Sequence, residues 1–174
     1  AAIGFVPQDP VIISTTLIDN IKLGRAVDEA TLNMAMRVSQ LERDMKAFPD
    51  GLDTALGERG MTLSGGQQQR LALARALAGR PSVLLLDDAT AALDADTESA
   101  FWKALETVLP DVAAVVGTHR SATIQRADRV IVLDERRIAQ VGTHSELIAQ
   151  PGPYRRIYGV LEVSDEAWAA KFKV

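Results

Sequence analysis

The sequence of 174 residues contains no cysteine, only 5% aromatic residues and no long apolar run. Without cysteine the chain can form neither disulfides nor thiolate metal sites, which is compatible with a reducing compartment. No apolar segment approaches the roughly 20 residues that a membrane-spanning helix needs, and residues 1–7 lack the pattern of a secretory signal. The net charge of −4 gives no long-range attraction to nucleic acid, so we expect no nucleic-acid partner.

The pattern that is present predicts one α/β domain. Hydrophobic residues make up 47% of the chain, enough for a core. Residues 11–78 have mostly helical spacing, and strands alternating with helices follow, which predicts a largely parallel sheet with helices packed on it. The continuous aliphatic run Val83–Leu86 is typical of a strand buried on both faces. The expected strands are Ile3 to Val6, Val83 to Leu86, Val112 to Val116, Arg129 to Leu133 and Arg137 to Val141, the last two paired through a turn.

A candidate phosphate site lies where a predicted helix begins, at Ser64. A helix start offers unpaired backbone N–H groups and a partial positive charge, which together attract anions. Gly65 and Gly66 carry no side chains that would keep a phosphate from the backbone, and the Ser64 hydroxyl can add a hydrogen bond. Taken alone, the same residues would be only a capped helix after a glycine turn. The neighbouring motifs decide between these interpretations.

Asp87 and Asp88 end a predicted buried strand, at the sheet edge where α/β proteins bind ligands. One carboxylate there can hold Mg²⁺ through water while the other polarises an attacking water. Asp94 is expected to cap the next helix. His119 follows the next strand at the same edge, and Gln8 follows the first. We expect His144 to be structural or merely exposed.

These motifs, in this order, resemble the ATP-binding cassette (ABC) ATPases. VPQDP around Gln8 is similar to the Q-loop, LSGGQ at Leu63–Gln67 to the signature and LLLDD at Leu84–Asp88 to the Walker B strand. AALD at Ala91–Asp94 is similar to the D-loop, and His119 to the switch histidine. TALGERG at Thr54–Gly60 and VGTHSELI at Val141–Ile148 resemble exporter segments.

The resemblance implies a P-loop NTPase-like α/β layer with an inserted α-helical subdomain, incomplete at its N-terminus. The helical signature subdomain would occupy about residues 9–78, and residues 1–8 and 79–174 would belong to the α/β core and C-terminal helices. The implied cofactors are ATP and Mg²⁺. The implied catalytic residues are Asp88, His119 and Gln8, the nucleotide contacts Ser64, Gly65, Gly66, Gln67 and Asp94, and the metal ligands Asp87 and Gln8.

Two departures from the family pattern are informative. No Walker A loop, G-x-x-x-x-G-K-S/T, occurs in these residues, so we expect that the chain was cut from a longer domain and that alone it binds ATP poorly and hydrolyses essentially none. Asp88 stands where the family usually has a catalytic glutamate, which shortens the side chain by about 1.5 Å. An intact signature beside such an aspartate resembles one half of a heterodimeric exporter. A homodimer that works slowly with aspartate is the alternative.

The implied partners are a second cassette, with a heterodimer favoured, and transmembrane domains contacted through the helical subdomain and the loop around Glu58. That places the domain at the cytoplasmic face of the cell membrane. Two other classes stay open: a non-catalytic or regulatory nucleotide-sensing cassette, and a soluble ABC protein outside transport. The transported substrate is not encoded in these residues.

Overall fold

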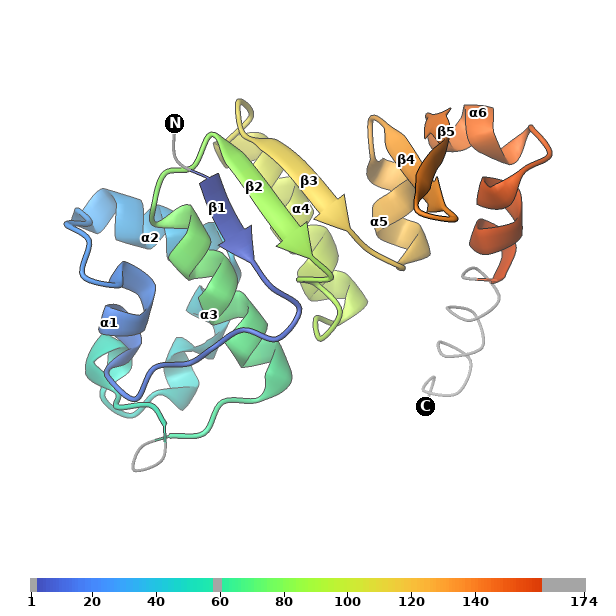
Figure 1. Cartoon of the computed structure of the whole chain (residues 1–174). Helices are drawn as coiled ribbons and strands as arrows, with labels where there is room; N and C mark the ends of the chain where they lie inside the picture. The colour runs from blue at the N-terminus through green and yellow to red at the C-terminus, as the bar shows by residue number, and fades with distance from the viewer. Residues whose placement is uncertain (1–2, 58–60, 161–174) are drawn as a thin grey trace. The chain divides into compact units, whose positions relative to one another are not determined.

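The computed structural model describes residues 3–57 and 61–160. The chain divides into two compact units, Ala1–Gly117 and Thr118–Val174, drawn in Figure 1. None of the helices in the described residues is both long and apolar enough to cross a membrane.

A three-stranded parallel sheet forms the centre of the first unit. Its strands are β1 (Ile3–Val6), β2 (Val83–Asp87) and β3 (Ala113–Gly117), in the spatial order β1-β2-β3. The register aligns Val6 with Leu86 and Leu86 with Val116. The parallel pairing predicted from the sequence is confirmed, and because all three strands run the same way, their carboxyl ends meet at one edge.

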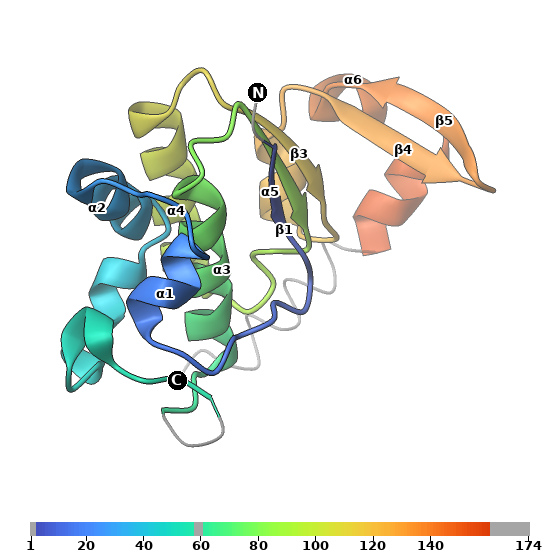
Figure 2. The ribbon, with the colours of Figure 1, turned by 60° about the vertical axis from the view of Figure 1, so that its left-hand side comes forward.

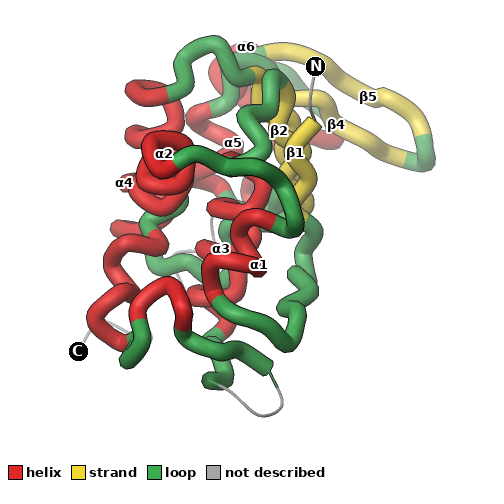
Figure 3. Tube along the Cα trace, turned by 90° about the vertical axis from the view of Figure 1, so that its left-hand side faces the viewer, coloured by secondary structure: helices red, strands yellow, loops and turns green. Residues whose placement is uncertain are grey.

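The helices of the first unit lie on one side of this sheet, as Figures 2 and 3 show. They are α1 (Leu17–Lys22), α2 (Glu29–Val38), α3 (Gly65–Leu77) and α4 (Ala95–Val108), with short 3-10 helices at Leu41–Ala47 and Gly51–Asp53. Helix α3 comes close to β1, because a Cβ on Gly4 would meet the Ala76 carbonyl oxygen at 3.3 Å. The core of the unit lies between this helical layer and the sheet, where Leu73, Leu77 and Leu84 are fully buried.

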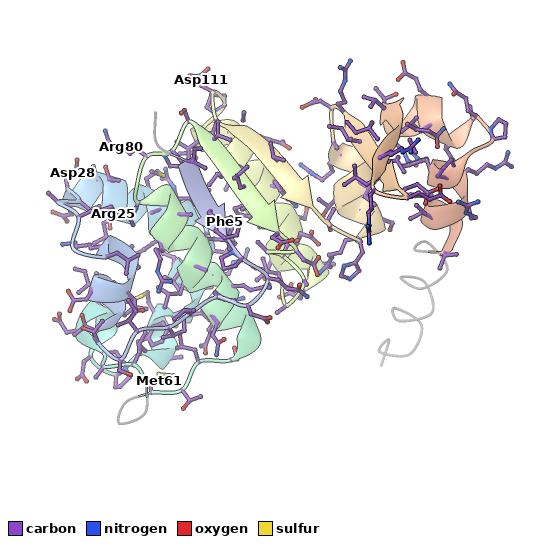
Figure 4. All side chains as sticks on the ribbon, viewed as in Figure 1. Phe5, Arg25, Asp28, Met61, Arg80 and Asp111 are labelled. Atoms are coloured by element: carbon purple, nitrogen blue, oxygen red, sulfur yellow. The ribbon has the colours of Figure 1, made fainter. Side chains whose placement is uncertain are left out.

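The opposite face of the sheet is exposed, contrary to the prediction that β2 is buried on both faces. Phe5, Leu85 and Val115 are in register across the three strands, and Leu85 is only half-buried. Phe5 is 58% exposed and Val115 is 61% exposed; Figure 4 labels Phe5 beside β1. The physical reason is that alternate side chains of a strand point to opposite faces, and the helices of this unit cover only one of them.

The second unit is built on an antiparallel hairpin of β4 (Val130–Asp134) and β5 (Arg137–Gly142). Glu135 and Arg136 turn the chain with φ angles of 46° and 62°, so the predicted pairing through this turn is confirmed. Helices α5 (Ser121–Arg126), which the sequence pattern did not predict, and α6 (His144–Ile148) complete the unit with a helical segment over 153–160. His144 Nδ1 lies 2.6 Å from the Tyr154 hydroxyl, which fits a structural role.

Candidate functional site

Gln8 and the two aspartates lie at the carboxyl edge of the parallel sheet in the first unit. Gln8 follows Val6 by two residues, and Val6 pairs with Leu86, immediately before Asp87. Asp87 ends β2 with an exposed side chain, and a Cβ on Gly117 would come within 3.4 Å of its Oδ1. The small residue on β3 therefore leaves room beside this carboxylate.

Asp88 adopts a left-handed backbone conformation, with φ at 46°. Aspartate is among the residues that tolerate this conformation. Its N–H donates to the Gly117 carbonyl oxygen at 2.7 Å, and its carbonyl accepts from the Ala91 N–H at 3.1 Å. These two bonds extend the pairing of β2 with β3 by one residue and start the turn that leads to α4. The half-buried side chain of Asp88 is thereby held directly after the strand end.

Ser64 is the N-cap of α3, as the sequence predicted. Its Oγ accepts a hydrogen bond from the Gln67 N–H at 3.4 Å, and the Gln67 Oε1 accepts from the Ser64 N–H at 3.0 Å. This reciprocal capping box satisfies two backbone donors. No acidic residue lies in the first turn of α3, so the partial positive charge of the helix start is not neutralised from within that turn. The start of α3 is therefore suited to an anion.

The start of α3 packs against the loop that joins β2 to α4. A Cβ on Gly65 would meet Ala92 Cβ at 3.5 Å, and one on Gly66 would meet the Ala92 carbonyl oxygen at 3.1 Å. Gln69, one turn further along α3 and only 5% exposed, accepts a hydrogen bond from the Ala92 N–H at 2.8 Å. The glycines thus have a packing reason as well as a chemical one.

Asp94 ends the same loop and caps α4, as predicted. Its carboxylate accepts hydrogen bonds from the Thr97 N–H at 2.8 Å and the Thr97 hydroxyl at 2.7 Å. The backbone hydrogen bond from Thr97, and then its side-chain hydrogen bond, hold the pKa of Asp94 below its ordinary value. Within the loop the Thr90 hydroxyl donates to the buried carboxylate of Glu98 at 2.8 Å. The side chains of Thr90 and Asp94 thus both bond the loop to the first turn of α4.

A bidentate ion pair joins α3 to the 3-10 helix Leu41–Ala47. Arg70 Nε and Nη2 lie 2.6 and 2.9 Å from the two carboxylate oxygens of Asp44. The Gln67 Nε2 also reaches Asp44, at 3.5 Å. The side chain of Gln67 is therefore used to cap and orient the helix, and its predicted nucleotide contact stays a prediction.

His119 comes two residues after β3, in the second unit, with an exposed side chain. Its predicted action with Asp88 therefore stays a prediction. Glu58 lies outside the described residues. Within the part of the chain that the structure describes, no cluster of three or more His, Cys, Asp or Glu residues could hold a metal ion. Mg²⁺ nevertheless often binds through one or two protein carboxylates, such as that of Asp87, while phosphate oxygens and water molecules complete its coordination shell.

Gln69, Arg70 and Asp44 were not identified from the sequence. A signal for Gln69 was present, because it precedes Leu73 by four residues and Ala76 by seven on the same helical face, and both are buried. A glutamine at a core-facing position implies a buried hydrogen bond. Asp44 gave no such signal, because its partner lies 26 residues away along the chain.

A family described as ABC transporter matches residues 1–91. Over 158 residues the chain is 40% identical to an ATP-dependent lipid A-core flippase of Paraburkholderia xenovorans. This match covers 91% of the chain and 26% of the relative. Over 157 residues it is 43% identical to a mitochondrial potassium channel ATP-binding subunit of Rattus norvegicus, covering 89% of the chain and 22% of the relative.

A solved structure of a bacterial Atm1-family ABC exporter with ATP bound is similar to the chain with a TM-score of 0.84 and 37% sequence identity. The match covers 91% of the chain and 28% of the exporter chain. The chain thus spans about a quarter of the length of these relatives.

Proposed function

The chain belongs to the ABC transporter family, and on that premise we propose that it forms part of the ATP-driven motor of a membrane exporter. The observation that carries this proposal is the contact between its two principal motifs. The helix start at Ser64 to Gly66 packs on Ala92, in the loop that follows Asp87 and Asp88. The start of α3, which is suited to an anion, and the carboxylates at the sheet edge lie in the same unit. This arrangement suits a motor that couples nucleotide binding to hydrolysis.

We assign the residues as follows. Asp87, with Gln8, would hold Mg²⁺, which neutralises phosphate charge when bound. Asp88 would accept a proton from water at its carboxylate, and His119 would support that step. The first turn of α3 would contact the nucleotide of a second cassette through these residues: Ser64, Gly65, Gly66 and Gln67. Asp94, which caps α4, would also contact the nucleotide.

The proposed division keeps residues 9–78 as the helical signature part, with residues 1–8 and 79–174 in the α/β core. The helical part and the loop around Glu58 would contact transmembrane domains, which puts the chain at the cytoplasmic face of the membrane. The relatives' names point to different cargoes, a lipid and an ion, so we assign none.

Charge at the signature helix tests the nucleotide contact. Ser64→Asp keeps a good N-cap but places a negative charge where the phosphate would lie. We expect ATPase activity of the full-length protein to fall by about 10- to 100-fold, while the melting temperature stays near that of wild type. Ser64→Asn is the matched control, because it also caps the helix and carries no charge. Equal activities of the two variants would contradict the proposed contact.

Nucleotide titration tests whether the chain needs phosphate contacts from elsewhere. Because these residues contain no Walker A loop, we expect the 174-residue chain alone to bind ATP poorly and the full-length protein to bind it well. A full-length protein that binds ATP without hydrolysing it would favour the nucleotide-sensing class instead.

Asp88 favours a finer proposal, in which this chain is the weakly hydrolysing half of a heterodimer and its signature completes the site of its partner. Asp88→Glu, assayed in the full-length protein with its partner cassette, should then raise ATPase activity by about 10-fold or more, because the longer side chain brings the carboxylate within reach of water. An unchanged rate would mean that the aspartate is competent and would support the slow homodimer.

A further inference from the structure

Gln69 ties the signature helix to the loop that follows Asp88. Its Oε1 accepts the Ala92 N–H at 2.8 Å, although the two residues are 23 positions apart in the chain. Gln69 is only 5% exposed, whereas Ala92 is exposed, so the hydrogen bond is part-buried. The bond directly connects the two motifs, and it is made by a residue that the proposed function does not use.

The loop around Ala92 has little freedom to move independently of α3. The Ala92 N–H donates to Gln69. The start of α3 also lies close to Ala92, because a Cβ on Gly66 would meet the Ala92 carbonyl oxygen at 3.1 Å. The neighbouring Ala91 N–H donates to the Asp88 carbonyl at 3.1 Å. A displacement of α3 would act on Ala92 through these contacts, and the Ala91 hydrogen bond would pass it to the backbone of Asp88.

We propose that Gln69 is a positioning residue, which holds Asp88 and the start of α3 in a fixed mutual orientation through Ala92. This inference rests on the proposed ATPase function. Gln69 touches no nucleotide in this assignment and acts only through the loop. Its loss should lower the turnover number and leave ATP affinity almost unchanged, because a misplaced catalytic group slows the chemical step without removing a binding contact.

Four variants of the full-length protein in lipid nanodiscs test this. Gln69→Met removes the acceptor at nearly constant volume, and Gln69→Asn keeps the amide but shortens its reach, which covers the case in which the methionine variant does not fold. Gln69→Glu keeps an oxygen that can accept the Ala92 N–H. The control is Thr31→Val on helix α2. It removes another buried acceptor, the Thr31 hydroxyl, which accepts a hydrogen bond from Arg80 Nε at 2.8 Å.

We expect kcat to fall about 10-fold in Gln69→Met and Gln69→Asn, with KM for ATP within about 2-fold of wild type and with activity largely restored in Gln69→Glu. Amide hydrogen exchange at Ala92 should accelerate in the first two variants and not in Thr31→Val. If Gln69→Met and Gln69→Asn lose no more kcat than Thr31→Val, Gln69 has only a structural role and the inference is wrong. A wild-type protein without ATPase activity would instead refute the proposed function, on which this inference depends.

Discussion

Asn20 has a fully buried side chain in the first unit, and its amide makes hydrogen bonds to the segment that follows Gln8. Its Oδ1 accepts hydrogen bonds from the Ile13 N–H and from Arg75 Nη2, both at 2.9 Å. Its Nδ2 donates to the carbonyl oxygens of Ile13 and Thr16, at 2.9 and 3.0 Å. Both polar atoms of this amide are therefore engaged, in hydrogen bonds that are part-buried.

Asn20→Ala should lower the free energy of unfolding by about 3 kcal/mol, because several part-buried hydrogen bonds are lost at once and a buried side chain is truncated. Urea denaturation of the chain measures this. Asn20→Asp keeps the acceptor for Ile13 and Arg75 but places a carboxylate oxygen against the Ile13 and Thr16 carbonyl oxygens, so it should also be destabilising. A loss below about 0.5 kcal/mol in Asn20→Ala would contradict the network.

Asp94→Ala should destabilise the first unit by about 1 kcal/mol at neutral pH through loss of the α4 cap. The hydrogen bonds from Thr97 lower the pKa of Asp94 in the folded state. The contribution of its charge is therefore complete above the ordinary aspartate pKa of about 4 and disappears as pH falls through the lower folded-state pKa. Denaturation at several pH values should show the deficit shrinking in acid. Asp94→Asn, which caps without charge, should have a smaller deficit at neutral pH, and this deficit should also shrink in acid because the group that titrates is the wild-type carboxylate.

At the scale of elements, the ion pair of Arg70 and Asp44 holds α3 to the 3-10 helix Leu41–Ala47. Their side chains are only 13% and 12% exposed, so the pair lies between a surface ion pair and a fully buried one. Breaking such a pair leaves one charge in a poorly hydrated site. The position of α3, and with it the helix start at Ser64, depends on this connection.

Arg70→Met should lower the free energy of unfolding by about 2–3 kcal/mol, because Asp44 keeps its charge without its partner. Chemical denaturation measures the loss. The double variant Arg70→Met/Asp44→Leu should recover much of it, because it removes the remaining charge as well. A double variant less stable than Arg70→Met would show that the loss in free energy of unfolding comes from the missing ion pair and not from the isolated Asp44 charge.

At the scale of the whole molecule, we expect the exposed face of the sheet in the first unit to promote self-association. Phe5 and Val115 are 58% and 61% exposed on either side of Leu85. Parallel sheets normally have both faces covered, and a contiguous exposed apolar patch promotes association.

The variant Phe5→Ser/Val115→Thr should reduce self-association of the 174-residue chain, measured by light scattering over a range of concentrations. Stability should change by less than about 1 kcal/mol, because both side chains are exposed. As a control, Val6→Thr on the covered face should destabilise the chain instead, since Val6 is fully buried. Unchanged scattering in the double variant would show that this face does not drive association.

The sequence by itself determined the order of the strands, the parallel pairing of the first three strands and the caps at Ser64 and Asp94. These depend on local spacing, on aliphatic runs and on short polar side chains beside backbone donors, all of which are readable along a few residues. The ordered motifs also identified the family, because each needs particular residue types at one place in the chain.

Only the tertiary structure decided which sheet face is covered and which residues connect the motifs. Val83 to Leu86 is equally apolar whether one or two layers of helices lie on it, so its burial depends on neighbours elsewhere in the fold. The bond from Ala92 to Gln69 and the pair of Arg70 with Asp44 span 23 and 26 residues. Such contacts form only when the packing of α3 brings distant segments together, and no local pattern specifies both partners.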